Sequence, residues 1–432
     1  MSHFQAAQTT SDFVKTPAEA SAFRSPVMQF FAKVFGFLGV VFSNIGLLLV
    51  LVLVGHFALT WVWDYKEAYK DNSGFVQYSW PVYDDFEGRY QLAREYTESR
   101  KHVAFHPYYM WRSLPFKSQY VNVDANGNRI TPRVEPVSTH AKKVFVLGGS
   151  TVFGEGSPDN GTIPAHLQAI LGTEYEVLNM GEVAYTSTQE LNYLLEYLSN
   201  GERPDIVIFY DGVNDGQVSV YHPAEPRGVY SIEKTLGFKT HRLTMSEVFQ
   251  AMVERSGYAH LGKIGQKIRE KMSPDPSGGK PQDGEWDREI APKIATNVDA
   301  TLQHYDEVIR QVKGLETAYG FKSYFFWQPN LFSDTRKPVA YEQEIVDKQS
   351  QPTWIRSQQA LYTAARPRFS NREDERVYFL GDIFNTHPNP VFIDWCHITP
   401  DANRIIAQEM AEMILQQPES KTALTSDKLA SI

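Results

Sequence analysis

A serine follows two glycines at the end of an apolar run, in the sequence Gly148-Gly149-Ser150-Thr151. Two glycines let the backbone turn sharply, so that the hydroxyl of Ser150 stands clear of the chain. A hydroxyl presented in this way is a candidate nucleophile if a base lies next to it. An ordinary turn and a phosphate-binding loop are the alternatives, although the spacing fits neither of the glycine-rich phosphate motifs. The rest of the chain must decide between a nucleophile and a plain turn.

A carboxylate and an imidazole stand three residues apart near the C-terminal end of the chain. They are Asp394 and His397, followed by Thr399 and Pro400, which are typical of a helix N-cap and first helical residue. At this spacing the carboxylate can orient the imidazole as a general base. A metal-binding pair and a capping aspartate beside an unrelated histidine are the alternatives, and no third metal ligand is evident nearby. We therefore expect acid–base chemistry here and no metal.

Two further loops contain hydrogen-bond donors. Gly181 in Asn179-Met180-Gly181 lets a backbone N–H approach a ligand closely, and Asn214 in Tyr210-Asp211-Gly212-Val213-Asn214-Asp215 offers a side-chain amide. Each would be an ordinary loop by itself. Both loops, like that of Ser150, directly follow a predicted strand. We therefore expect all three to lie at one edge of a sheet.

Short apolar strands alternate with periodic helices from residue 142 onward. Strands are expected at residues 143–147, 176–179, 205–210, 322–327 and 377–380. This alternation predicts an α/β fold with a parallel sheet covered by helices on both faces. In such sheets ligands bind at the carboxyl ends of the strands, where the polar loops are found.

Two helices of this region are expected to bury one apolar face each. The first begins at a capping box formed by Ser187 and Glu190. The two faces comprise Leu191, Leu194, Leu195 and Leu198 in the first helix, and Val298, Leu302, Tyr305, Ile309, Val312 and Leu315 in the second. An insertion at residues 217–290 and the loop Gln328-Pro329-Asn330 are expected to line the substrate pocket.

A long apolar run precedes this region. It extends over residues 34–63, which are 30 residues without one Asp, Glu, Lys or Arg. A bilayer core needs about 20 apolar helical residues, so the run predicts one transmembrane helix. The alternatives are a cleaved signal peptide, whose apolar region is only ~7–15 residues long, and a buried core helix, which is also shorter.

Charges beside the run predict its orientation. Lys15, Arg24 and Lys33 precede it, and Lys66 and Lys70 follow it. Positive charge is in excess on the cytoplasmic side of membrane proteins, so three against two favours an N-terminus inside the cell. We expect a single-pass protein of a bacterial inner membrane with its large C-terminal part in the periplasm. A small-residue pair four apart, Gly39 and Ser43, is compatible with a homo-oligomer or with a partner in an envelope complex.

The composition sets further limits. The chain has 432 residues and a net charge of −9, from 42 Lys+Arg and 51 Asp+Glu. This acidic surplus excludes a protein that grips nucleic acid along its length. The single cysteine, Cys396, excludes an internal disulfide and a cysteine-based structural zinc site.

The expected organisation is a cytoplasmic leader at residues 1–33, a membrane helix at 34–63, an accessory segment at 64–141 with a hairpin turn at Asn126-Gly127, a domain at 142–417 and a tail at 418–432.

The four polar blocks together resemble those of the SGNH/GDSL hydrolase family. The serine, glycine and asparagine blocks match Gly148-Gly149-Ser150, Asn179-Met180-Gly181 and Gly212-Val213-Asn214, and the Asp-x-x-His block matches residues 394–397. They occur in the family's order. One departure is Gly149, where the GDSL pattern has aspartate, and this is similar to the GGST-type branch. Residues 107–131 also look like the segment that precedes the domain in membrane-anchored relatives.

The resemblance implies a three-layer α/β/α sandwich and a serine mechanism without a cofactor. Ser150 would attack an acyl carbonyl, with His397 as general base and then general acid and Asp394 holding its tautomer. The oxyanion would be held by the backbone N–H groups of Ser150 and Gly181 and by the side chain of Asn214.

Three functions from different classes are compatible with these residues. The first is a membrane-anchored esterase that removes O-acyl groups, acetyl foremost, from a polysaccharide or lipid of the cell envelope. The second is an acyltransferase, in which a sugar hydroxyl replaces water in the same acyl-enzyme mechanism. The third is a non-catalytic, membrane-tethered scaffold that binds a glycan or a partner, and the complete set of candidate residues counts against it. We therefore predict the esterase.

Overall fold

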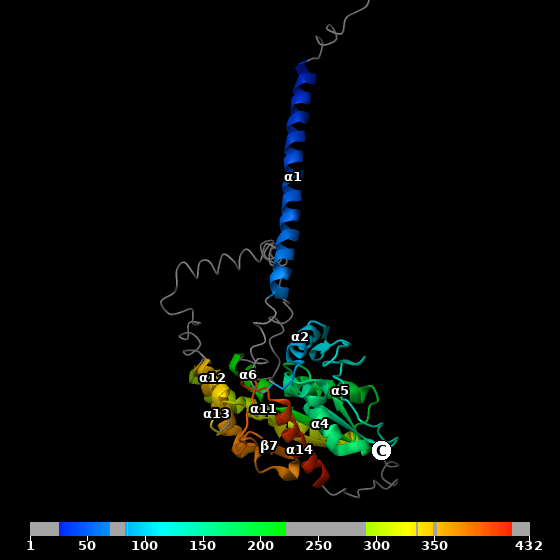
Figure 1. Cartoon of the computed structure of the whole chain (residues 1–432), viewed down its shortest axis with the longest axis vertical. Coiled ribbons are helices and arrows are strands. Elements are labelled where there is room, and N and C mark those ends of the chain that lie inside the picture. Colours follow the sequence, from blue (N-terminus) through cyan, green and yellow to red (C-terminus); the bar gives the residue numbers. More distant parts are fainter. Residues whose placement is uncertain are drawn as a thin grey trace, which may run out of the picture. The chain divides into compact units, whose positions relative to one another are not determined.

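The structure is a computed structural model of the chain, shown as a cartoon in Figure 1. It describes residues 26–69, 83, 85–221, 291–333, 336–348 and 352–416. Most of the predicted insertion, from residue 222 to 290, and the predicted tail lie outside the described residues. The chain divides into two compact units. Helix α1 (Pro26–Tyr69) belongs to the first, and the other described elements belong to the second.

Five parallel strands form the centre of the second unit. They are β3 (Lys142–Gly148), β4 (Tyr175–Asn179), β5 (Ile206–Asp211), β6 (Lys322–Trp327) and β7 (Val377–Phe379). Their order in space is β4-β3-β5-β6-β7, and each neighbouring pair is parallel. The strands agree closely with the predicted ones, because short runs of branched and aromatic residues suit a sheet that is buried on both faces.

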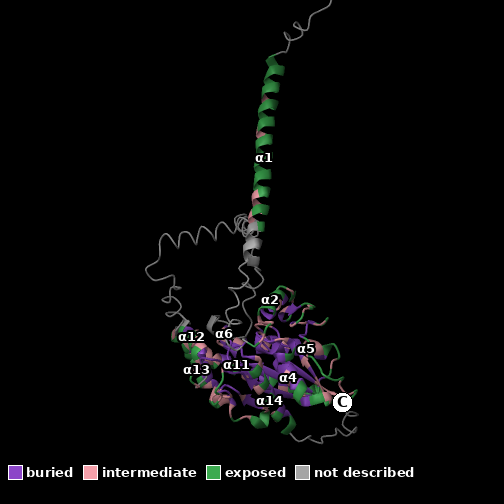
Figure 2. Cartoon of the chain, in the orientation of Figure 1, coloured by how far each residue is buried: buried purple, intermediate pink, exposed green. Residues whose placement is uncertain are grey.

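Helices cover both faces of this sheet, so that buried residues are concentrated along it (Figure 2). In β3, Phe145 and Leu147 contribute to one apolar cluster, while Val144 and Val146 contribute to the other. Helices α5 (Ser187–Ser199), α6 (Val213–Tyr221), α11 (Ile294–Tyr319) and α13 (Pro352–Phe369) pack in the first cluster, and α4 (Ile163–Leu171) and α14 (Pro400–Gln416) pack in the second. The predicted α/β/α sandwich with a parallel sheet is confirmed.

Helix α5 differs from its prediction in two details. Its capping box is formed by Thr186 and Gln189, one residue before the expected pair of Ser187 and Glu190. The side chain of Leu195, expected in the apolar face, is 38% exposed because this position lies at the margin of the stripe. The other members of both predicted faces pack in the core, either buried or partly buried: Leu191, Leu194, Leu198, Val298, Leu302, Tyr305, Ile309, Val312 and Leu315.

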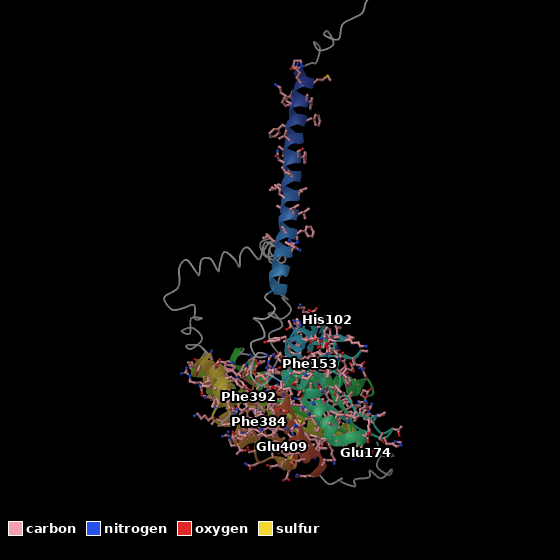
Figure 3. All side chains as sticks on the ribbon, in the orientation of Figure 1. His102, Phe153, Glu174, Phe384, Phe392 and Glu409 are labelled. Carbon is pink, nitrogen blue, oxygen red and sulfur yellow. The ribbon has the colours of Figure 1, made fainter. Side chains whose placement is uncertain are left out.

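The segment before the sheet packs on the α/β domain. It contributes α2 (Arg89–Ser99) and an antiparallel pair of strands, β1 (Val103–His106) and β2 (Met110–Ser113). Its apolar residues form one cluster with Phe153, labelled in Figure 3, and with Ile393. These two residues flank the Ser150 and Asp394 motifs, so the segment supports the site from one side.

The hairpin turn expected at Asn126-Gly127 is present. Gly127 has a φ of +80°, and the N–H of Asp124 donates to the carbonyl of Asn128 at 2.8 Å. The turn is flanked by isolated bridges rather than by full strands. It is followed by Arg129, whose buried guanidinium donates to Asp159 and to the backbone carbonyls of residues 153, 154 and 157. One buried cation therefore holds the stretch of chain that follows Ser150.

Helix α1 extends over 44 residues. It begins at Pro26, so that the last eight residues of the expected leader, 26–33, are helical, because proline suits the first turn and apolar residues follow it. Its stretch Pro26–Leu59 has a mean hydropathy of 2.7 in its most apolar window, none of which is buried (Figure 2). By length and composition this helix is able to cross a membrane.

Candidate active site

The candidate nucleophile lies at the carboxyl end of β3. Gly149 is extended, with φ −79° and ψ −151°, and Ser150 begins the short helix α3 (Ser150–Phe153). This helix ends after one turn at Gly154, whose φ of +98° lies in the left-handed region that favours glycine. The hydroxyl of Ser150 therefore stands at the edge of the sheet where parallel α/β folds bind ligands.

A chain of hydrogen bonds joins Ser150 to His397 and Asp394. Ser150 Oγ is 2.6 Å from His397 Nε2, and His397 Nδ1 is 2.6 Å from Asp394 Oδ2. Asp394 Oδ1 accepts the N–H groups of Cys396 and His397 at 2.8 Å each. A proton on Nδ1 directed at Asp394 leaves Nε2 to accept the proton of the serine. The structure thus brings these three predicted residues together.

The charges of this pair stabilise each other. Burial alone would raise the pKa of Asp394, but His397 and the two N–H donors hold it below its ordinary value. Burial alone would lower the pKa of His397, but the charge of Asp394, with a contribution from Glu155, raises it well above 6.5. The site therefore favours a carboxylate beside an imidazolium, which is the charge state produced when His397 takes a proton from Ser150.

The other predicted donors lie against the same turn. A Cβ at Gly181 would clash with the backbone of α3, so glycine permits this loop to approach the helix. The N–H of Gly181 donates to Asn179 Oδ1 at 3.1 Å, and Asn214 Nδ2 donates to the carbonyl of Tyr185 at 2.7 Å. The N–H of Ser150 has no acceptor within the described part of the chain. That group and the second hydrogen of the Asn214 amide are left for a ligand, whereas the N–H of Gly181, a predicted oxyanion donor, is already bonded to Asn179.

Gly149 has a steric reason to be glycine. Its extended backbone would suit other residues, so conformation alone does not require it. A Cβ at this position would collide with Nδ2 of Asn214. The glycine therefore permits the amide of Asn214 to lie directly against the serine turn. An aspartate, which the GDSL pattern has here, would require another position of the Asn214 side chain.

Two buried carboxylates, Asp211 and Asp215, anchor the loop that follows β5, and a third buried carboxylate, Glu190, lies near them. Tyr305 donates to Asp211 at 3.1 Å, and the hydroxyl of Ser187 donates to Asp215 at 2.6 Å. Burial raises the pKa of Asp211 to about 8, and it also raises the pKa values of Asp215 and Glu190. The cluster therefore retains a proton at neutral pH, which lowers the cost of burying three acids together.

Asp394, Cys396 and His397 are close enough together to suggest a metal site. The 2.6 Å between His397 Nδ1 and Asp394 Oδ2 is a direct hydrogen bond. A tetrahedral zinc ion bound to both atoms at about 2.0–2.2 Å would hold them more than about 3 Å apart. Burial also raises the pKa of the Cys396 thiol to about 12, so the thiol stays protonated. These residues fit hydrogen bonding better than metal binding.

Two contacts of the site were not predicted from the sequence. Glu155 Oε2 lies 3.2 Å from His397 Nε2, and Thr151 Oγ1 donates to Gln328 Oε1 at 3.1 Å. Gln328 belongs to a loop that was expected to line the pocket. Apart from the glycines around it, nothing in the sequence indicates that Glu155 faces the site. Its position depends on the left-handed turn at Gly154.

Comparisons with solved structures find similarities at low identity. A carbohydrate acetylesterase family member from Sinorhizobium meliloti is 14% identical over 64% of this chain and all of its own, with a TM-score of 0.33. An acetyl xylan esterase is 14% identical over 62% of this chain and 97% of its own, with a TM-score of 0.32. A lipolytic G-D-S-L family protein from Veillonella parvula is 10% identical over 64% of this chain and all of its own, with a TM-score of 0.32.

No family model and no curated protein matches the sequence. The similarities to solved structures are distant.

The contact between Gly149 and Asn214 predicts that substitutions of these two residues have non-additive effects on kcat. Asn214→Ala should lower the kcat for ester hydrolysis by about 10²–10³, since it removes one oxyanion donor. Gly149→Ala should lower kcat through the same donor, because the new methyl group displaces the Asn214 amide. In the double variant the second change should add little. Steady-state kinetics on folded variants, checked by circular dichroism, test this, and fully additive losses would contradict it.

The raised pKa of His397 predicts how kcat/KM depends on pH. Only neutral His397 can take the proton of Ser150, and its pKa is raised, so the active form appears at higher pH. We expect kcat/KM to rise with pH through a midpoint above 6.5. Asp394→Asn should move this midpoint to lower pH and reduce the plateau. A wild-type midpoint below 6.5 in the measured kcat/KM profile would contradict this assignment.

Proposed function

We propose that the protein is a membrane-anchored serine esterase of the SGNH type. Its substrates would be O-acyl esters, acetyl foremost, on a polysaccharide or lipid of the cell envelope. The observation that carries the proposal is the hydrogen-bonded chain from Ser150 through His397 to Asp394. Such a chain activates a serine hydroxyl for attack on a carbonyl. The order of the four sequence motifs supports the SGNH type.

The first half of the reaction would form an acyl-enzyme. Ser150 Oγ bonds to the acyl carbon while its proton passes to His397 Nε2, and Asp394 stabilises the resulting imidazolium. The carbonyl oxygen becomes an oxyanion, which the donors around α3 hold. When this intermediate collapses, the bond to the alcohol breaks and the alcohol oxygen takes the proton from Nε2.

The second half of the reaction would release the acid. Water gives a proton to His397 Nε2 and its oxygen bonds to the acyl carbon. Collapse of this second intermediate breaks the bond to Ser150 Oγ, and the serine recovers its proton from Nε2. His397 thus acts as base and acid in turn, so a single histidine suffices for both halves.

Substitution of the nucleophile tests this mechanism. Ser150→Ala should remove nearly all hydrolysis of p-nitrophenyl acetate and of acetylated glycans by the purified full-length protein, because no acyl-enzyme can form. Release of acetate and labelling by a fluorophosphonate probe measure the effect. Turnover by Ser150→Ala equal to that of the wild type would refute the mechanism. Acetyl transfer to an added oligosaccharide that exceeds hydrolysis would instead indicate an acyltransferase with the same residues.

The proposal also places α1 across the inner membrane of a bacterium, with the α/β domain in the periplasm. Support comes from the length and hydropathy of α1 and from the three positive charges before the apolar run against two after it. We expect a C-terminal alkaline phosphatase fusion, which is active only outside the cytoplasm, to be active. Activity of a cytoplasmic reporter at the same end would contradict this orientation.

A further inference from the structure

A second carboxylate faces the imidazole of the site, on the ring nitrogen that does not contact Asp394. Glu155 Oε2 lies 3.2 Å from His397 Nε2, the nitrogen that is also 2.6 Å from Ser150 Oγ. The side chain of Glu155 is 19% exposed, so part of it is accessible to a bound molecule. This carboxylate takes no part in the proton transfers between Ser150, His397 and Asp394.

The carboxylate is held in place. The backbone N–H of Glu155 donates to the carbonyl of Ser150 at 3.0 Å, directly after the left-handed turn at Gly154. The hydroxyl of Tyr96 in α2 donates to Oε2 at 2.7 Å. The other oxygen, Oε1, has no hydrogen-bond partner among the described residues. Glu155 thus presents a fixed acceptor oxygen beside the reacting nitrogen.

The reaction brings an alcohol to the same place. The leaving alcohol takes its proton from His397 Nε2, so its oxygen must approach Nε2 to hydrogen-bond distance, about 3 Å. Glu155 Oε2 lies 3.2 Å from the same nitrogen, so this alcohol comes to lie beside the carboxylate. A carboxylate can only accept hydrogen bonds, and a hydroxyl on the neighbouring carbon of the alcohol could supply one. A simple alcohol has nothing to donate there once its own oxygen is esterified.

We propose that Glu155 is a specificity-determining residue that selects esters of polyhydroxy alcohols. Its carboxylate accepts a hydrogen bond from a hydroxyl adjacent to the ester, and Tyr96 keeps it in position. This inference rests on the proposed esterase function and narrows it to alcohols that carry a neighbouring hydroxyl, such as sugars or a glycerol headgroup.

Two small esters isolate the proposed contact. We compare 2-hydroxyethyl acetate with 2-methoxyethyl acetate, which differ in whether the neighbouring oxygen can donate a hydrogen bond. The wild-type full-length protein should prefer the first by roughly 10- to 100-fold in kcat/KM, as for a hydrogen bond to a charged group. Glu155→Ala should bring the ratio to about 1. Glu155→Gln should keep part of the preference, since its amide oxygen still accepts.

The ratio separates recognition from an effect on the base. Both esters depend on the same His397, so a change in its basicity alters both rates equally and cancels in the ratio. Tyr96→Phe removes the hydrogen bond that holds the Glu155 carboxylate but leaves the carboxylate itself. It should therefore reduce the preference for 2-hydroxyethyl acetate. Glu98→Ala removes an exposed carboxylate of the same helix α2 and should leave the ratio unchanged.

The inference fails if the wild type shows no preference, or if folded Glu155→Ala retains it. Failure of the esterase function itself has a different signature, which is the absence of any Ser150-dependent hydrolysis of p-nitrophenyl acetate. Monoacetylated methyl glucoside and monoacetylglycerol identify the source of the alcohol. A preference for either over ethyl acetate that is lost in Glu155→Ala supports the inference.

Discussion

The site depends on one hydrogen bond between residues that are 247 positions apart. Ser150 Oγ and His397 Nε2 meet because β3 and the loop before α14 end at the same edge of the sheet. The parallel arrangement of the strands sends successive polar loops to that edge. Apolar clusters on both faces of the sheet then fix the separation of these loops. A shift of about 1 Å would suffice to weaken the pair.

The segment before the sheet is part of the site's support. Glu182, which follows Gly181, is fully buried and accepts the N–H of Ser113 and a hydrogen bond from Arg100. Arg129 binds carbonyls of the chain that follows Ser150, and Tyr96 contacts Glu155. The residues that support the site therefore come from two regions of the sequence, the segment before residue 142 and the alternating strands and helices that follow it.

The pKa values of buried carboxylates in this protein shift in opposite directions, according to the groups that surround them. Asp394 is held in its charged form by an imidazolium and two backbone donors, so its pKa is lowered. Asp211 lies among other acids, and burial raises its pKa to about 8. The same side chain thus orients a base in one place and shares a proton in the other. The overall charge of −9 says nothing of this difference.

The sequence by itself determined the strands, the sandwich, the apolar helix and the identity of the polar residues at the sheet edge. The strands, the sandwich and the apolar helix follow from local backbone preference and from the periodicity of burial, both of which are visible along the chain. The polar residues are identified by their chemical types after predicted strands and by the order of their motifs, which resembles that of the SGNH/GDSL family. Only the tertiary structure decided that Gly149 makes room for Asn214, that Leu195 is exposed and that Glu155 faces His397. Those contacts depend on turn geometry and on which loops meet, and a side chain's type does not reveal its distant neighbours.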